Sequence, residues 1–195
     1  MTTTASVVWW AIAAVLLFWA VGAYNRLMRL RAEANAAFAN VDAELARHVA
    51  LVREHLPPPD ATQPAPLGGG DAGSFWDALH AAASQLSATL AAARGKPLDA
   101  ENIAALSAAQ DVLRMAWDRA ERDDAHDLAG PRLPDTVLLR RAQLLLQAHA
   151  ATQNFNTAVA RYNEAIGQFP AVLLAWLFGF KAARALAPVI VPQLA

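Results

Sequence analysis

Histidine and acidic side chains are the residues of this chain whose types and spacing could support metal binding or acid–base chemistry. His48 and His55 lie seven residues apart, close to Glu44 and Glu54. On a helix this spacing corresponds to about 10 Å, so a metal site would need ligands from a further helix. We expect instead that the two histidines lie on a solvated helix face.

A second cluster combines acidic residues with a histidine near the middle of the chain. It consists of Glu121, Asp123, Asp124, His126 and Asp127. Oxygen ligands of this kind suit a hard cation, but the cluster lacks the glycine turn of an EF-hand loop. The pattern favours a charged helix end over a metal site.

The other residue types give no catalytic pattern. No serine lies in a Gly-x-Ser-x-Gly elbow, and the absence of cysteine excludes thiol nucleophiles, disulfides and Cys-linked lipid anchors. A formal charge of −1, with basic residues spread along the chain, argues against a nucleic-acid partner. We therefore predict a protein that is not an enzyme and has no cofactor or metal site.

The elements that would position these residues are helical. The chain has 195 residues, enough for one domain, and 56% of them are hydrophobic, with alanine prominent. Alanine is the best helix former, and its abundance predicts an all-α fold.

An apolar stretch near the N-terminus predicts a transmembrane helix over residues 5–24, after a short tail of residues 1–4. About twenty apolar residues extend roughly 30 Å as a helix, which is enough to cross a bilayer. A cleaved signal peptide is the alternative, since Val21 and Ala23 resemble a cleavage site. No Lys or Arg precedes the stretch, which favours the anchor.

Aromatic and basic residues flank this span as they do in membrane proteins. Arginines follow it directly, and no basic side chain precedes it. The positive-inside rule therefore predicts a single-pass protein of the bacterial inner membrane, with the N-terminus outside and the rest cytoplasmic. The predicted membrane-interface residues are Trp9, Trp10, Trp19, Tyr24, Arg26, Arg29 and Arg31.

Beyond the span, apolar residues from Leu27 to Leu56 repeat at spacings of three and four, which predicts a first bundle helix over residues 25–56 that continues the span. Prolines 57–59 end it, and the Pro- and Gly-rich residues 57–73 predict an exposed linker.

Three further helices are predicted within residues 74–169. They begin at Ser74, at Asp99 as N-cap, and at Asp135, and each has one apolar stripe in coiled-coil-like spacing. The stripe of the last helix consists of Leu138, Leu145, Ala148, Thr152, Phe155, Val159, Tyr162, Ile166 and Phe169. Such helices must pack on each other, so we expect an antiparallel up-down four-helix bundle.

In this topology the last helix returns toward the membrane, so residues 170–195 should lie near it. Residues 171–180 are apolar all round but too short to span. Two interpretations stay open for this segment. It is a core helix that covers the end of the bundle, or it is an interfacial segment or partner-binding patch, with Lys181 and Arg184 near lipid phosphates.

Several short motifs resemble the LemA family of bacterial membrane proteins. The family has a Tyr-Asn pair after its N-terminal span, an Ala-aromatic followed by an Asp, and, near its C-terminus, paired Tyr-Asn motifs, a Phe-Pro and a Gly-Phe. The matched stretches cover about a third of the chain, in the family's order. The corresponding residues are Tyr24, Asn25, Phe38, Asp42, Phe155, Asn156, Tyr162, Asn163, Phe169, Pro170, Gly179 and Phe180.

This chain also departs from the family. The family's Arg-rich turn with Ile-Pro-Asn-Leu is absent, and residues 74–135 match no family motif. The resemblance implies a helical bundle on a membrane anchor in a divergent member, and the family brings no established catalytic activity.

The paired motifs also have a physical interpretation. Phe155 and Tyr162 share one helix face, and so do Asn156 and Asn163. We expect the aromatic rings to fill the seam between helices and the asparagines to fix helix register, with a ligand site as the alternative.

Taken together, the sequence predicts a membrane-anchored, non-catalytic scaffold or adaptor. Its partners would be the lipid bilayer and an unidentified protein, and a homo-oligomer is a further option. The alternatives are a ligand- or metal-sensing module, with a pocket near Trp76, His80 and Trp117, and a self-assembling membrane-organising protein.

Overall fold

The structure is a computed structural model and describes residues 2–56, 72–126 and 134–190. It contains five helices and, within these ranges, no strand, which confirms the all-α class. The helices are α1 (Thr2–His55), α2 (Ala72–Gly95), α3 (Ala100–His126), α4 (Asp135–Gly167) and α5 (Ala171–Phe178).

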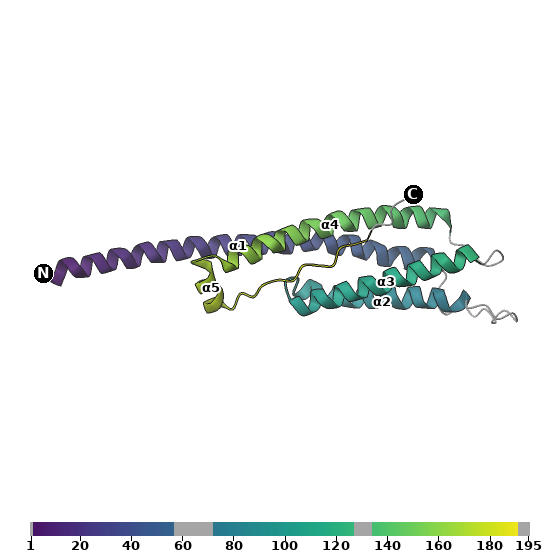
Figure 1. Cartoon of the computed structure of the whole chain (residues 1–195), viewed down its shortest axis with the longest axis horizontal. Helices are drawn as coiled ribbons and strands as arrows, with labels where there is room; N and C mark the ends of the chain where they lie inside the picture. The colour runs from purple at the N-terminus through teal and green to yellow at the C-terminus, as the bar shows by residue number, and fades with distance from the viewer. Residues whose placement is uncertain (1, 57–71, 127–133, 191–195) are drawn as a thin grey trace.

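Helix α1 is one unbroken helix of 54 residues that combines the predicted span with the first bundle helix. Residues 2–4, predicted as a tail, already belong to it. Its N-terminal part projects beyond the rest of the molecule as far as Trp19, which contacts Phe169, and the remainder packs against the other helices (Figure 1). Of the described residues, α1 is the one helix long and apolar enough to cross a membrane.

The four long helices form the predicted up-down bundle, with each helix antiparallel to the one before it (Figure 1). The Asp99 side chain accepts a hydrogen bond from the Asn102 N–H at 3.2 Å and so caps α3 as predicted. Helix α2 begins at Ala72, so the last two residues of the predicted linker are helical. The remainder of that linker, residues 57–71, lies outside the described residues.

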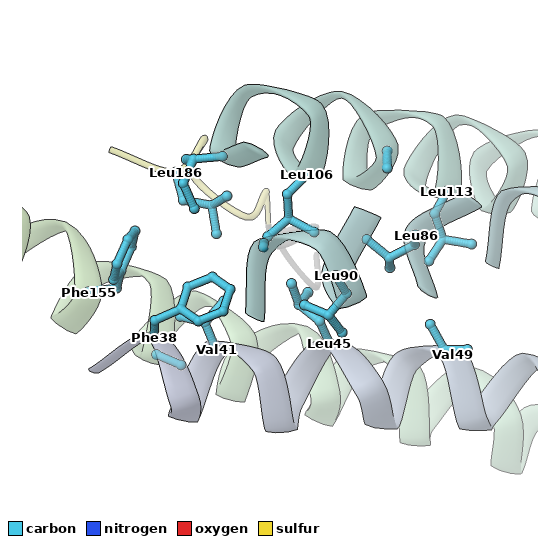
Figure 2. Close-up of a cluster of buried hydrophobic side chains, with 14 of the residues drawn as sticks. Phe38, Val41, Leu45, Val49, Leu86, Leu90, Leu106, Leu113, Phe155 and Leu186 are labelled. Carbon is cyan, nitrogen blue, oxygen red and sulfur yellow. The ribbon is translucent and has the colours of Figure 1, made fainter. Parts of the chain in front are cut away.

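The apolar stripe of α1 forms the centre of the core. Phe38 and Phe155 meet edge to face with ring centroids 5.6 Å apart, which joins α1 to α4. Figure 2 shows side chains from α1, α2 and α3 converging on the same cluster. The buried residues of the α1 stripe are Leu27, Ala34, Phe38, Val41, Leu45, Val49, Val52 and Leu56.

The predicted stripe of α4 is partly wrong. Its middle part, from Ala148 to Tyr162, is buried as predicted. Leu138 and Leu145 are only half-buried and Phe169 is 67% exposed, and near the start of α4 the buried stripe instead includes Arg141. A search for apolar residues at helical spacing misses a stripe that contains an arginine. Arg141 can be buried only because carboxylates from another helix pair with it, and these cannot be identified from the local sequence.

The backbones of neighbouring bundle helices do not all pack closely. Helix α1 lies against α2 and α4, and α2 lies against α3, but the described residues of α3 and α4 nowhere approach within 8 Å between α-carbons. The bundle is therefore open along one side at the level of its backbone.

The C-terminal segment closes this side, which corrects the expectation that residues 170–195 stay near the membrane. Helix α5 does lie beside the span, but Gly179 then turns the chain with φ +69°, a conformation that favours glycine. Residues 181–190 are not helical and run back along the bundle, antiparallel to α4 (Figure 1). Residues 191–195 lie outside the described part.

The core predicts a large cost for loss of its central aromatic pair. We expect Phe38→Ala to lower the free energy of unfolding by about 3–5 kcal/mol, because a buried ring is replaced by a cavity. Met115→Ala, at a side chain that is 53% exposed, is the control and should change it by less than about 0.5 kcal/mol. Thermal unfolding in detergent measures both, and equal effects would contradict the assigned core.

Candidate interaction site: the groove between α3 and α4

Two asparagines of α4 bind the main chain of the C-terminal segment. The Asn163 side chain donates to the Ala183 carbonyl and accepts from the Ala183 N–H, both at 2.8 Å. The Asn156 side chain does the same with Leu186, at 2.9 and 2.8 Å. Each amide thus satisfies both main-chain polar groups of one residue.

These contacts follow a regular spacing. His149 and the two asparagines are seven residues apart on α4, and the His149 Nδ1 lies 2.8 Å from the Val189 carbonyl. Seven residues of helix extend about 10.5 Å, and three residues of extended chain cover about 9–10 Å. The rise of two turns of α4 is therefore close to the length of three residues of the segment, so side chains seven apart on α4 reach every third residue of the segment.

Helix α3 supplies the opposite wall. The Ala187 N–H donates to the Ser107 hydroxyl at 3.2 Å, and this hydroxyl donates to the Ile103 carbonyl at 2.9 Å. Ala183 and Leu186 are buried in the main core, with Leu186 only 2% exposed. Figure 2 shows Leu186 in the same cluster as Leu106 of α3 and Phe155 of α4. The segment thus fills the gap between the two helices.

The asparagines do not have the partner that the sequence predicts. Asn156 and Asn163 were expected to fix register between helices, whereas their amides bind an irregular segment. Phe155 and Tyr162 are buried in the core, and the Tyr162 hydroxyl donates to the Lys181 carbonyl at 3.3 Å. The missed contacts from Ser107 and His149 had one signal, the seven-residue spacing of His149 from Asn156.

The segment begins where α5 meets the end of the apolar span. The Trp19 and Phe169 rings lie 5.0 Å apart, and the Tyr24 ring lies 5.3 Å from Phe178 and 6.2 Å from Phe180. The Arg31 guanidinium lies over the Phe180 ring at 5.7 Å. Helix α5 is therefore held against α1 by aromatic contacts.

The remaining predicted residues lie at or near the surface. Arg26 donates to the Gln168 side chain at 3.5 Å, Arg29 pairs with Glu33 at 3.6 Å, and Asp42 pairs with Arg94 at 2.7 Å. Pro170 directly precedes α5 and Gly179 directly follows it. Trp9, Trp10 and Asn25 are exposed.

A surface of exposed apolar side chains, here called the apolar collar, lies on one side of α1 at the end of the span. Trp176, 84% exposed, is its largest member. The collar is continuous with the apolar part of α1 through the Trp19–Phe169 contact. It consists of Phe169, Val172, Leu173, Trp176, Leu177 and Phe178.

A cavity of about 60 Å³ lies beneath the last residues of the segment, Ala187 to Ile190, and both apolar and polar side chains line it. Arg141 lines it, stands over the Trp117 ring at 5.0 Å and forms ion pairs with Glu121 and, at 3.7 Å, Asp118. Burial lowers the pKa of Arg141, and the two carboxylates oppose that shift, so the group stays charged.

His48 lines the same cavity, which corrects the expectation of a solvated face. Its Nε2 is buried without a hydrogen-bond partner, whereas His55 is exposed. Burial, together with the nearby Arg141 charge, lowers the pKa of His48 to about 4, against a hydrogen bond to the Leu144 backbone and the charge of Glu44. The ring is therefore neutral at pH 7.

Across the described part of the chain, no three His, Asp or Glu residues cluster closely enough to hold a metal ion. The side chains of Asp123, Asp124, His126 and Asp127 from the predicted acidic cluster lie outside that part, and Glu121 pairs with Arg141.

No protein-family model matches this chain, and no curated protein or solved structure matches it. The fold and the site define an all-α bundle with an apolar span at one end and, along its side, a groove that holds an extended segment of the same chain.

The asparagine contacts predict a specific local weakening. Asn163→Asp keeps an acceptor for the Ala183 N–H but places a carboxylate oxygen against the Ala183 carbonyl. Losing a hydrogen bond costs about 1–2 kcal/mol, so the Ala183 amide should exchange hydrogen about tenfold faster. Asn154→Asp, at an exposed position of α4, is the control. Unchanged exchange at Ala183 would refute the contact.

The buried His48 predicts a pH-dependent stability. Its folded pKa lies below its unfolded value of about 6.5, so as the pH falls from 6.5 toward 4 the unfolded chain takes up a proton that the native chain excludes. In this window the free energy of unfolding should fall by roughly 1 kcal/mol for each unit by which the pH is lowered.

His48→Gln should therefore flatten the fall of the melting temperature between pH 6.5 and 4, relative to the parent chain. His55→Gln, at an exposed ring, should leave the slope unchanged. Identical slopes for the parent chain and His48→Gln would show that His48 titrates normally.

Proposed function

We propose that this protein is a membrane-anchored, non-catalytic scaffold or adaptor that resembles the LemA family. Its setting would be the bacterial inner membrane, with the N-terminus outside and the bundle in the cytoplasm. The observation that carries the proposal is the continuity of α1, whose apolar half is exposed and whose other half is the centre of the core.

Exposed apolar surface supports the anchor. Residues 7–19 of α1 are exposed on all sides of the helix. Exposing this much apolar surface to water is unfavourable, whereas in lipid it has no such cost. The apolar collar extends this surface sideways at the end of the span, where amphipathic and aromatic groups favour the bilayer interface. Lipid is accordingly the first proposed partner.

Basic residues on the bundle side of the span support the orientation. Arg26, Arg29 and Arg31 follow the span on α1, and Lys181 and Arg184 are exposed just after α5. Cations near a cytoplasmic leaflet meet anionic lipid headgroups, each contributing about 1 kcal/mol.

The shape of α1 supports a scaffold. From Tyr24 to His55 the helix extends about 47 Å, so it holds the far end of the bundle at a set distance from the lipid. The polar side chains of the groove bind the chain's own backbone. Such an arrangement suits interaction with a protein partner, including a further copy, and not with nucleic acid.

A ligand-sensing role is the second candidate, and one observation favours it. Three residues that line the cavity beside Trp117 have a buried polar atom without a hydrogen-bond partner: His48 Nε2, Gln110 Nε2 and Arg114 Nε. A small polar molecule could supply the missing bonds.

Cysteine labelling tests the anchor and its orientation, because the chain contains no natural cysteine. Single cysteines replace Thr4, ahead of the span, or Ser84, an exposed residue of α2. In intact cells a membrane-impermeant maleimide should label T4C and leave S84C unlabelled until the cells are lysed.

Labelling of S84C instead would reverse the orientation. The same samples, washed at alkaline pH, should stay in the membrane fraction, and release into solution would contradict the anchor itself.

A further inference from the structure

The segment from Phe180 to Ile190 is organised like a bound peptide. Every third residue faces the bundle: Ala183 and Leu186 are buried, and Phe180 and Val189 are half-buried. The residues between them, such as Lys181, Arg184 and Pro188, are mostly exposed. A period of three is that of an extended polyproline-II chain, which forms no internal hydrogen bonds and relies on its surroundings.

Recognition of this segment runs mainly through its backbone. Asn163 and Asn156 each bind the N–H and carbonyl of a single residue, and these groups are common to every residue except proline, which lacks the N–H. Pro188 occupies a position whose N–H the groove does not need. The side chains add only a size requirement, small at Ala183 and branched aliphatic at Leu186.

The start of the segment argues against exchange with a second copy. Phe180 contacts Tyr24 and Arg31 of its own α1. A neighbouring copy's segment, still attached to its own α5, would have to give up these contacts to reach the groove. An extended segment from another protein makes no such contacts and has none to lose when it binds the groove.

We propose that the groove between α3 and α4 is a binding site for extended polypeptide, and that residues 180–190 are its resident intramolecular ligand. The incoming ligand is a partner's segment with a small residue and, three positions on, a branched aliphatic residue, neither of them proline. The proposal rests on the adaptor function above and gives that function its partner site.

The resident segment sets the condition for exchange. Being attached to α5, it competes at an effective concentration of about millimolar. A free peptide must therefore reach about that concentration to displace it. Release of Phe180 from α1 would lower this threshold, so the position of α5 controls access to the groove.

The test uses Leu186→Cys in the full-length chain, reconstituted in lipid nanodiscs. The thiol is buried while the segment is bound, and its rate of reaction with a maleimide reports release. The probe is a synthetic peptide with the sequence of residues 179–190. At about 5 mM peptide, above the effective concentration, we expect the rate to rise at least about fivefold.

Two altered peptides separate recognition from general loosening. In one, the residues at positions 183 and 186 are proline, which removes the N–H groups that the asparagines bind, and this peptide should have no effect. In the other, the exposed positions 182 and 185 are proline, and this peptide should act like the parent.

Hydrogen exchange of the Ala183 and Leu186 amides in the unsubstituted chain, with the same peptides, repeats the test without the cysteine. The proposal is overturned if the parent peptide leaves the rates of maleimide reaction and hydrogen exchange unchanged, or if all three peptides raise them equally. Either result leaves the anchor and orientation untouched, because the labelling of T4C and S84C tests those separately.

Discussion

A buried segment without regular structure must have its backbone polar groups satisfied by its surroundings, and the rest of this fold depends on how that is done. The backbones of α3 and α4 stay apart, and the ion pairs of Arg141 join the two helices only at one end. The bundle therefore needs residues 181–190 to keep water from the rest of its core. The segment supplies no internal hydrogen bonds, and Asn156 and Asn163 make four for it. Without those bonds, burial of Leu186 would strand an N–H and a carbonyl in apolar surroundings, at about 1–3 kcal/mol each.

Helix α1 connects this groove to the apolar end of the molecule. It is at once the exposed span, the surface on which α5 lies, and the centre of the core. The segment begins at Phe180, where the ring contacts Tyr24 at the end of the span. A displacement of α5 would therefore move the start of the segment. The groove walls would stay in place, because α4 packs on α1 and α3 packs on α2, which itself lies against α1.

Local pattern predicted most of the helical architecture. The long helix through the span, the four bundle helices and the Asp99 cap follow from apolar periodicity, prolines and capping chemistry, which act within a few residues. The path of residues 181–190 could not be predicted this way, because its partners lie 19 to 40 residues away on α4 and 80 away on α3. Arg141 and His48 were missed for a related reason: each is a polar residue whose burial depends on groups from other helices.

The position of the segment between α3 and α4 is the central claim, and a cysteine pair tests it most directly. Ser107→Cys and Ala187→Cys, in a chain without other cysteines, should form an intramolecular disulfide under mild oxidation, since the Ala187 N–H reaches the Ser107 hydroxyl at 3.2 Å. Ser84→Cys with Ala187→Cys, which joins the segment to an exposed position of α2, should not. If the first pair stays reduced, or links only different molecules, the segment does not occupy this groove.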